Sequence, residues 1–394
     1  MKFLRKRVDK IKPHFEEGGR FYFLHSVFDG FETFLFVPDH VTKKGAHIRD
    51  AIDMKRTMII VVLALMPALL FGIYNTGLQH FIATGQPQEF WPMISYGIIK
   101  VIPLIAVTYI VGLGIEFAFA QVRKHEISEG FLVTGILIPL IVPADIPLWM
   151  LAIATAFAVI IGKEVFGGSG MNILNPALTA RAFLFFAYPS WMSGDKIWVS
   201  GMMSGEGIID GYSGATLLAQ SATGASNFIN GFGEKVSHLE MFIGTIPGSV
   251  GETSIIAILL GALILLVAGL GSWRIMFSTL AGGIVMGLLL NVFAVNSAME
   301  VAWFEQLMLG GFAFGMVFMA TDPVTGAQTN KGKYIYGFLI GFLAILIRVL
   351  NPAYPEGMML AILLMNVFAP LIDHLVVQQN IKKRLKRSVS SVKS

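Results

Sequence analysis

The chain is dominated by apolar runs that are each about as long as a helix must be to cross a bilayer. At 1.5 Å per residue, a helix needs roughly twenty apolar residues to span about 30 Å of hydrocarbon. Such runs occupy residues 57–79, 95–120, 130–146, 147–163, 175–190, 252–270, 274–294, 302–320, 334–350 and 357–377. Only 14% of the residues are charged, against about a quarter in ordinary soluble domains. The sequence therefore predicts an all-α polytopic membrane protein of about ten transmembrane helices, which could divide into two five-helix repeats.

Basic residues indicate which ends of these runs face the cytoplasm. If the first run starts inside, the inside connections and the tail hold Arg123, Lys124, Lys163, Arg274, Lys331, Lys333, Lys382, Lys383, Arg384, Lys386 and Arg387. The outside connections hold only Lys196 and Lys235, both within a long loop at residues 191–251. Both termini are therefore predicted to be cytoplasmic, and the 191–251 loop periplasmic.

Three parts follow from this layout. A basic and aromatic N-terminal arm covers residues 1–56, a membrane domain covers 57–378, and a basic tail covers 379–394. The aromatic part of the arm is too short and too interrupted to cross a bilayer, so it is expected to lie at the membrane surface or to bind a partner. Since the basic residues lie in terminal blocks, membrane lipid is the expected partner and nucleic acid is not.

The chain contains no cysteine, which excludes disulfides, thiolate zinc sites and cysteine-ligated iron–sulfur clusters. Motifs for a P-loop, a Rossmann fold, a metalloprotease or a nucleophile elbow are also missing from the sequence. If the chain handles electrons, its carrier must therefore be a flavin, a quinone or a haem.

The stretch GYSGATLLAQ, residues 211–220, belongs to the polar 191–251 loop. Gly214 and Ala215 would let the backbone approach a ligand closely, while Ser213 and Thr216 supply hydroxyl groups. Runs of small residues are equally typical of a flexible linker. From the residues alone, both interpretations stay open.

Two further segments interrupt apolar runs with Gly, Asn and Pro. The first is GKEVFGGSGMNILNPALTARAF, with Asn172 and Asn175, and the second is FMATDPVTGAQTNKGKYIYGF, with Asp322. Irregular backbone at membrane depth survives only where it is buried in protein or lines a cavity. The segments therefore indicate either capped helix ends or a pocket for a cofactor or an ion, and paired broken helices favour a binding site.

Together these motifs resemble the NqrB-type membrane subunit of the sodium-translocating NADH:quinone oxidoreductase family. The resemblance rests on SGAT in the long loop, on GKEVFGGSGMNILNPALTARAFLFFAYP before it and on MATDPVTGAQTNKGKYIYG after it, and it covers nearly the whole chain. The related RnfD-type subunits share the membrane core and an S-G-A-T loop but look shorter at their start. The long N-terminal arm therefore favours the NqrB type.

The resemblance implies that Thr216 carries flavin mononucleotide (FMN) through a phosphoester, with Ser213, Gly214 and Ala215 beside it. It also implies a non-covalent riboflavin, for which Asn172 and Asn175 are the candidate contacts, and quinone reduction near the cytoplasmic face. It implies Na⁺ translocation, and Na⁺ prefers oxygen ligands, so Asp322, Asp373 and Glu126 are candidates for the ion path. Asp373 could equally cap a helix.

The same resemblance implies a multi-pass protein of the bacterial inner membrane. Because NADH oxidation needs a nucleotide fold and iron–sulfur ligands that this sequence lacks, other membrane, flavin and iron–sulfur subunits are the expected partners. An RnfD-type subunit of a ferredoxin:NAD oxidoreductase and a non-redox channel or transporter stay as alternatives.

Overall fold

The computed structural model describes residues 2–393 except 17, 26–27, 29, 31, 33–34, 37–41, 43, 47–53, 124–129, 206, 226 and 352–353. Its helices are α1 (Lys2–Ile11), η1 (Lys12–His14), η2 (Tyr22–Leu24), α3 (Met54–Thr84), α4 (Phe90–Arg123), α5 (Phe131–Leu140), α6 (Leu148–Ile160), η3 (Glu164–Phe166), α7 (Pro176–Ala187), η4 (Pro189–Trp191), α8 (Leu217–Ala222), α9 (His238–Ile243), α10 (Ile255–Val267), α11 (Trp273–Val292), α12 (Ser297–Glu300), α13 (Trp303–Met308), α14 (Phe312–Phe314), the π-helix η5 (Gly315–Met319), α15 (Asn330–Leu350) and α16 (Gly357–Lys393). Within these ranges the only strand-like pairing is an isolated bridge between Ile229 and Lys235. The all-α prediction is confirmed.

Six segments of the described chain are long and apolar enough to cross a membrane. They are Met54–Thr84, Phe90–Arg123, Leu148–Phe166, Trp273–Val292, Asn330–Leu350 and Gly357–Arg387. Helices α5, α7 and α10 are apolar but shorter, and the predicted run at 302–320 is broken into α13, α14 and η5. The prediction of ten full-length spans is therefore too simple, although a multi-pass membrane protein is what the helices form.

Local chemistry explains where several of these shorter elements begin and break. Asn175 accepts hydrogen bonds from the first amides of α7, and Ser254 does the same for α10, so each helix begins at its cap. The run at 302–320 breaks at Gly310, whose backbone has a φ of +56°, a conformation that favours glycine. The π-turn that follows at residues 315–319 belongs to a class of helix defect that is frequent at functional sites.

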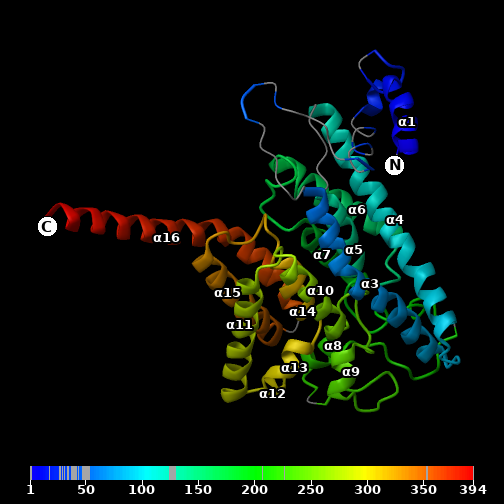
Figure 1. The fold of residues 1–394 in the computed structure, drawn as a ribbon. Helices are drawn as coiled ribbons and strands as arrows, with labels where there is room; N and C mark the ends of the chain where they lie inside the picture. The colour runs from blue at the N-terminus through cyan, green and yellow to red at the C-terminus, as the bar shows by residue number, and fades with distance from the viewer. Residues whose placement is uncertain are drawn as a thin grey trace.

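The helices of the two halves pack in a similar order. In the first half α4 packs on α6 and α6 packs on α7, while in the second half α11 packs on α15 and α15 packs on α16. Helix α3 joins the halves through its contact with α10. Figure 1 shows α8, α9, α12 and α13 gathered at the end of the bundle opposite α1, and the C-terminal part of α16 projecting away from it.

Glycine allows a close backbone contact between α11 and α15. A Cβ atom at Gly341 would overlap the carbonyl oxygen of Thr279, and one at Gly282 would overlap the carbonyl oxygen of Phe338. Close backbone approach at small residues is the usual way in which helices associate in membranes.

We expect Gly341→Ala to weaken this contact by about 1–3 kcal/mol, because the methyl group forces the two backbones apart. The matched control is Gly114→Ala in α4, where a Cβ meets no atom within 4 Å. The melting temperature of detergent-solubilised protein should fall for Gly341→Ala and not for Gly114→Ala. Equal melting temperatures would contradict the packing described for α11 and α15.

Candidate functional site

The loop at 191–251 is folded. It contains α8 and α9, and it has a small apolar core of its own, made of Leu217, Leu218, Phe228, Val236, Met241 and Ile246 together with Val301 and Leu309. Ser237 and Glu240 form a capping box that starts α9. The flexible-linker interpretation of GYSGATLLAQ is therefore wrong, because its residues are held by helices and by apolar packing.

Thr216 lies at the start of α8 and is half-buried. Its Oγ1 accepts a hydrogen bond from the amide of Ala219 at 3.1 Å, which makes it the N-cap. Ser213 is exposed, and Ala215 is half-buried. Gly214 is buried, and a Cβ there would come within 2.6 Å of both Asp195 O and Met202 Sδ. The small size of Gly214 therefore serves packing against residues 195–202, and its place beside a ligand stays a prediction.

Thr216 lines a cavity with about 690 Å³ of empty space, part of it open to solvent. We call it the Thr216 cavity, and its wall comes from segments that are distant in sequence: Arg181, Phe185, Met192, Ser193, Gly194, Trp198, Thr216–Ala219, Ile246–Ser249, Glu252, Thr253, Met308, Gly310, Gly311, Pro355 and Glu356. Its wall combines charged, hydroxyl and aromatic side chains from the loop and from the helix bundle.

Arg181 forms the charged floor of this cavity. Its Nη1 donates to Glu252 Oε1 at 2.5 Å, and its Nε donates to Glu356 Oε2 at 2.8 Å. Only 5% of Arg181 is exposed, so its charge lies inside the protein and not at the membrane surface. Because its partners lie 71 and 175 residues away, no local pattern in the sequence could have found them.

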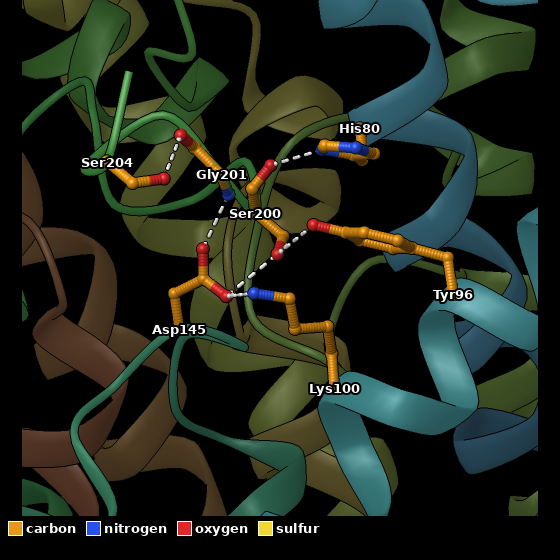
Figure 2. A network of polar contacts seen from close by, with 7 residues as sticks. All are labelled: His80, Tyr96, Lys100, Asp145, Ser200, Gly201 and Ser204. Atoms are coloured by element: carbon orange, nitrogen blue, oxygen red, sulfur yellow. Dashed lines mark hydrogen bonds and ion pairs between the residues drawn. The ribbon is translucent and has the colours of Figure 1, made fainter. Parts of the chain in front are cut away.

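A second polar network ties the loop to the helices beside it, as Figure 2 shows. It joins His80, Tyr96, Lys100, Asp145, Ser200, Gly201 and Ser204. Asp145 accepts from Lys100 Nζ at 2.8 Å, from Ser200 Oγ at 2.7 Å and from the amide of Gly201 at 2.5 Å. His80 stacks on Tyr96 with ring centroids 3.9 Å apart and bonds to Ser200 O at 2.8 Å. Residues 199–202, against which Gly214 packs, are thereby fixed relative to α3 and α4.

Tyr212 carries a second hydroxyl group close to Thr216, just before Ser213 in the sequence. Its ring is buried and packs edge-on against Phe232 with centroids 5.1 Å apart. Burial raises the pKa of Tyr212 to about 12, so the phenol stays protonated at physiological pH. Tyr212 therefore supports the loop as a neutral packing residue and not as a base.

The second candidate site is a larger cavity with about 1160 Å³ of empty space, which we call the Asp322 cavity. Both broken segments line it, through Lys163, Ser169, Gly170, Asn172, Asn175 and Pro176 on one side and Phe318, Thr321–Val324 on the other. Asn175 Nδ2 donates to Asp322 Oδ2 at 3.3 Å, which joins the two segments directly. The remaining wall is mostly apolar, which is typical of a cofactor pocket with a few orienting polar groups.

The three carboxylates proposed for the ion path have different positions. Asp322 lines the cavity and accepts from Thr325 Oγ1 at 3.0 Å and from the amide of Val324 at 2.9 Å. Asp373 does not line it, and accepts from the amides of Gln328 and Thr329 at 2.6 and 2.9 Å. Glu126 lies outside the described residues. Within the described part of the chain, three or more His, Cys, Asp or Glu side chains nowhere form a cluster that could hold a metal ion.

Sequence reasoning missed three polar residues at or beside the Asp322 cavity. Lys163 is 3% exposed, lines the cavity and pairs with the buried Glu116 of α4. The hydroxyl of Tyr336 lies 2.7 Å from the side-chain amide of Asn366. With its amide nitrogen toward Tyr336, Asn366 accepts a hydrogen bond from the backbone amide of Asn175 at 3.1 Å. The signal for Lys163 was present in the sequence, because a lysine at a broken membrane helix needs a partner.

The two cavities lie near opposite ends of α3. Thr57 near its start lines the Asp322 cavity, while Asn75 donates to the carbonyl of Ile246, which lines the Thr216 cavity. At 1.5 Å per residue, the distance along α3 between these residues is about 27 Å, close to the thickness of a bilayer core.

Comparisons with known proteins find relatives of this chain over nearly its whole length. The model of the NQR2, RnfD, RnfE family matches residues 41–382. The NqrB subunit of the Na(+)-translocating NADH-quinone reductase of Ectopseudomonas mendocina is 48% identical over 98% of this chain and 100% of its own length. Proteins of the same name from Stutzerimonas stutzeri and Pseudomonas aeruginosa are 46% and 45% identical, again over 98% of this chain and at least 99% of theirs.

We expect Asp145→Ala to loosen residues 195–202, because Lys100, Ser200 and the amide of Gly201 lose their shared acceptor, at a cost of about 1–3 kcal/mol. Limited proteolysis followed by mass spectrometry should show faster cleavage in this segment. The matched control is Glu234→Ala, which removes an exposed carboxylate of the same loop. Cleavage at the unsubstituted rate in Asp145→Ala would show that the network does not hold the loop.

Proposed function

The chain belongs to the NQR2, RnfD, RnfE family, and on that premise we propose that it carries electrons between two flavin sites in a Na⁺-translocating NADH–quinone reductase. It is a multi-pass membrane subunit of such a complex, as its helices and its full-length relatives indicate. The observation that carries the proposal is the hydroxyl of Thr216, within S-G-A-T, at the wall of a cavity that also presents aromatic and charged side chains.

FMN is proposed to be held at Thr216 through a phosphoester. The residues present fit such a group: Thr216 supplies the oxygen, and Phe185 and Trp198 supply aromatic surface in the same cavity. The flavin would supply the electron-transfer chemistry that a chain without cysteine cannot provide itself. The protein would fix the attachment point through α8 and shield part of the flavin from water.

The Asp322 cavity is the proposed site of riboflavin, with quinone reduced nearby. Asn172 and Asn175 can donate to and accept from the polar edge of a flavin, and the apolar remainder of the wall suits its ring system. The distance between the cavities makes this subunit a route for electrons across the membrane. With both termini cytoplasmic in a bacterial inner membrane, Thr216 would face the periplasm and Asp322 the cytoplasm.

Na⁺ is proposed to reach Asp322. This carboxylate is the ionisable oxygen ligand in the cavity wall, and Thr321 and the carbonyl groups of the interrupted backbone add further oxygen atoms. Asp373 is proposed to act indirectly by holding the segment at 328–329 in place. Subunits that bind NADH and carry iron–sulfur clusters complete the enzyme.

An RnfD-type subunit is the second candidate, because the matching family model also covers that group. An assay of the purified complex with NADH and quinone, against one with ferredoxin and NAD, separates the two. A channel or transporter without redox chemistry is excluded by a flavin that stays on the chain after denaturation.

We expect Thr216→Ala and Thr216→Asn both to abolish covalent flavin, read as fluorescence of the band after denaturing electrophoresis. Asn keeps the N-cap that Ala loses, at a cost of about 1 kcal/mol, so loss in both variants depends on the hydroxyl and not on α8. Ser213→Ala, which removes an exposed hydroxyl in the same motif, should keep full fluorescence. A fluorescent band in Thr216→Asn would end the assignment.

We expect Asp322→Asn to raise the Na⁺ concentration for half-maximal quinone reduction by about tenfold, equivalent to 1.4 kcal/mol. Flavin content should stay unchanged, because the Asn side chain keeps the size of Asp. Asp373→Asn should lower stability and leave the Na⁺ requirement as it was. The same half-saturation in Asp322→Asn as in the parent would place the ion path elsewhere.

A further inference from the structure

Four charged groups lie between the Thr216 cavity and the interior of the bundle: the buried Arg181, Arg348 and Glu252, and the partly buried Glu356. All four line a smaller cavity of about 330 Å³. Arg181, Glu252 and Glu356 also line the Thr216 cavity, so the two spaces share one charged wall. We call this group the charge quartet.

The four members of the quartet come from four separate segments of the chain. Arg181 of α7 uses both ends of its guanidinium, toward Glu252 at 2.5 Å and Glu356 at 2.8 Å. Ser249 donates to the other oxygen of Glu252. This fork geometry matches the planar donors of arginine to two carboxylates, and a lysine could not reproduce it.

Arg348 differs from Arg181 because it has no carboxylate within ion-pair distance among the described residues. Its Nη1 and Nη2 donate to the carbonyl groups of Gln306 and Leu309 at 2.6 and 3.1 Å. Its Nε is buried without a hydrogen-bond partner in the described structure, and the residue is 2% exposed. Glu252 and Glu356 together carry one more charge than Arg181 can neutralise. The positive charge of Arg348 is therefore balanced through space by these two carboxylates.

Glycines bring the quartet close to the loop that carries Thr216. A Cβ at Gly311 would overlap Glu252 Oε1. A Cβ at Gly310 would lie 2.8 Å from Leu218 of α8 and 3.7 Å from Arg348 Nη2. The break between α13 and α14 thus lets charged groups reach a cavity that side chains would otherwise fill.

We propose that the charge quartet sets the reduction potential of the flavin held in the Thr216 cavity. The inference rests on the proposed function, which places a flavin there. Each electron that a reduced carrier of a partner subunit delivers to the flavin adds one negative charge unless a proton accompanies it. In a site of low dielectric constant this charge interacts strongly with fixed charges nearby. With two arginines and two glutamates ionised, the quartet is neutral, so removing one member leaves a net charge of known sign.

The sign of the effect follows directly. Glu252→Gln or Glu356→Gln leaves a net positive charge, which stabilises the reduced flavin and raises its midpoint potential. Arg348→Gln leaves a net negative charge and lowers it. General loosening of the cavity, in contrast, would expose the flavin to water and shift its potential in the same direction in all three variants. Opposite signs therefore separate an electrostatic role from a merely structural one.

The test is a spectroelectrochemical titration of the whole purified complex. Each variant is measured with and without Thr216→Ala, and the difference isolates the flavin at Thr216 from the other flavins. Fluorescence of the denatured band confirms that the flavin is attached. The matched control is Glu234→Gln, the same change of charge on an exposed residue of the same loop.

We expect upward shifts for Glu252→Gln and Glu356→Gln, a downward shift for Arg348→Gln and no shift for Glu234→Gln. If Arg348→Gln fails to assemble, Arg181→Gln supplies the variant with a net negative charge, and if one glutamate variant fails, the other supplies the net positive charge. A fluorescent band with no shift in the quartet variants, or with shifts all in one direction, overturns this inference and leaves the proposed function standing. No fluorescent band in the unsubstituted protein overturns both.

Discussion

Backbone that leaves a helix inside a membrane must find hydrogen-bond partners outside the helix. In this chain side chains supply those partners, and both cavities lie at the places where they do so. Asn175 is the clearest case. Its Oδ1 caps α7 through the amide of Ala177 at 3.0 Å, and its Nδ2 reaches Asp322 at 3.3 Å. At the other end of α3, Asn75 satisfies the carbonyl of Ile246 at 3.0 Å. The helices stop short of a full span at these places, and the space they leave becomes the two candidate sites.

Buried charges hold the two halves of the chain together at these ends. An unpaired charge in a low-dielectric interior is costly, so each needs a partner, and the partners of Arg181 come from the segments before α10 and α16. Lys163 and Glu116 do the same within the first half. These contacts place the Thr216 loop over a charged floor and not over plain apolar surface.

Sequence alone predicts the helical class and the membrane location, and it marks the two broken segments, because hydropathy and Gly/Pro punctuation are local signals. It predicts span lengths poorly. The run at 302–320 is continuously apolar, yet its helix breaks at Gly310. The break is set by the backbone conformation of Gly310 and not by the composition of the run. It also does not predict that Gly214 packs against Asp195 and Met202, because that contact depends on where the loop folds back. Arg181 and its distant glutamates are beyond any local pattern.

Thr216 is proposed to anchor a flavin at one end of a membrane-crossing electron path, and every other role assigned to this chain depends on that anchor. Tandem mass spectrometry of the peptide that contains residues 211–220, taken from the native complex, tests it most directly. The expected result is a phosphate-linked FMN on Thr216, with Ser213 unmodified. An unmodified peptide, or a flavin attached to any other residue, would contradict it.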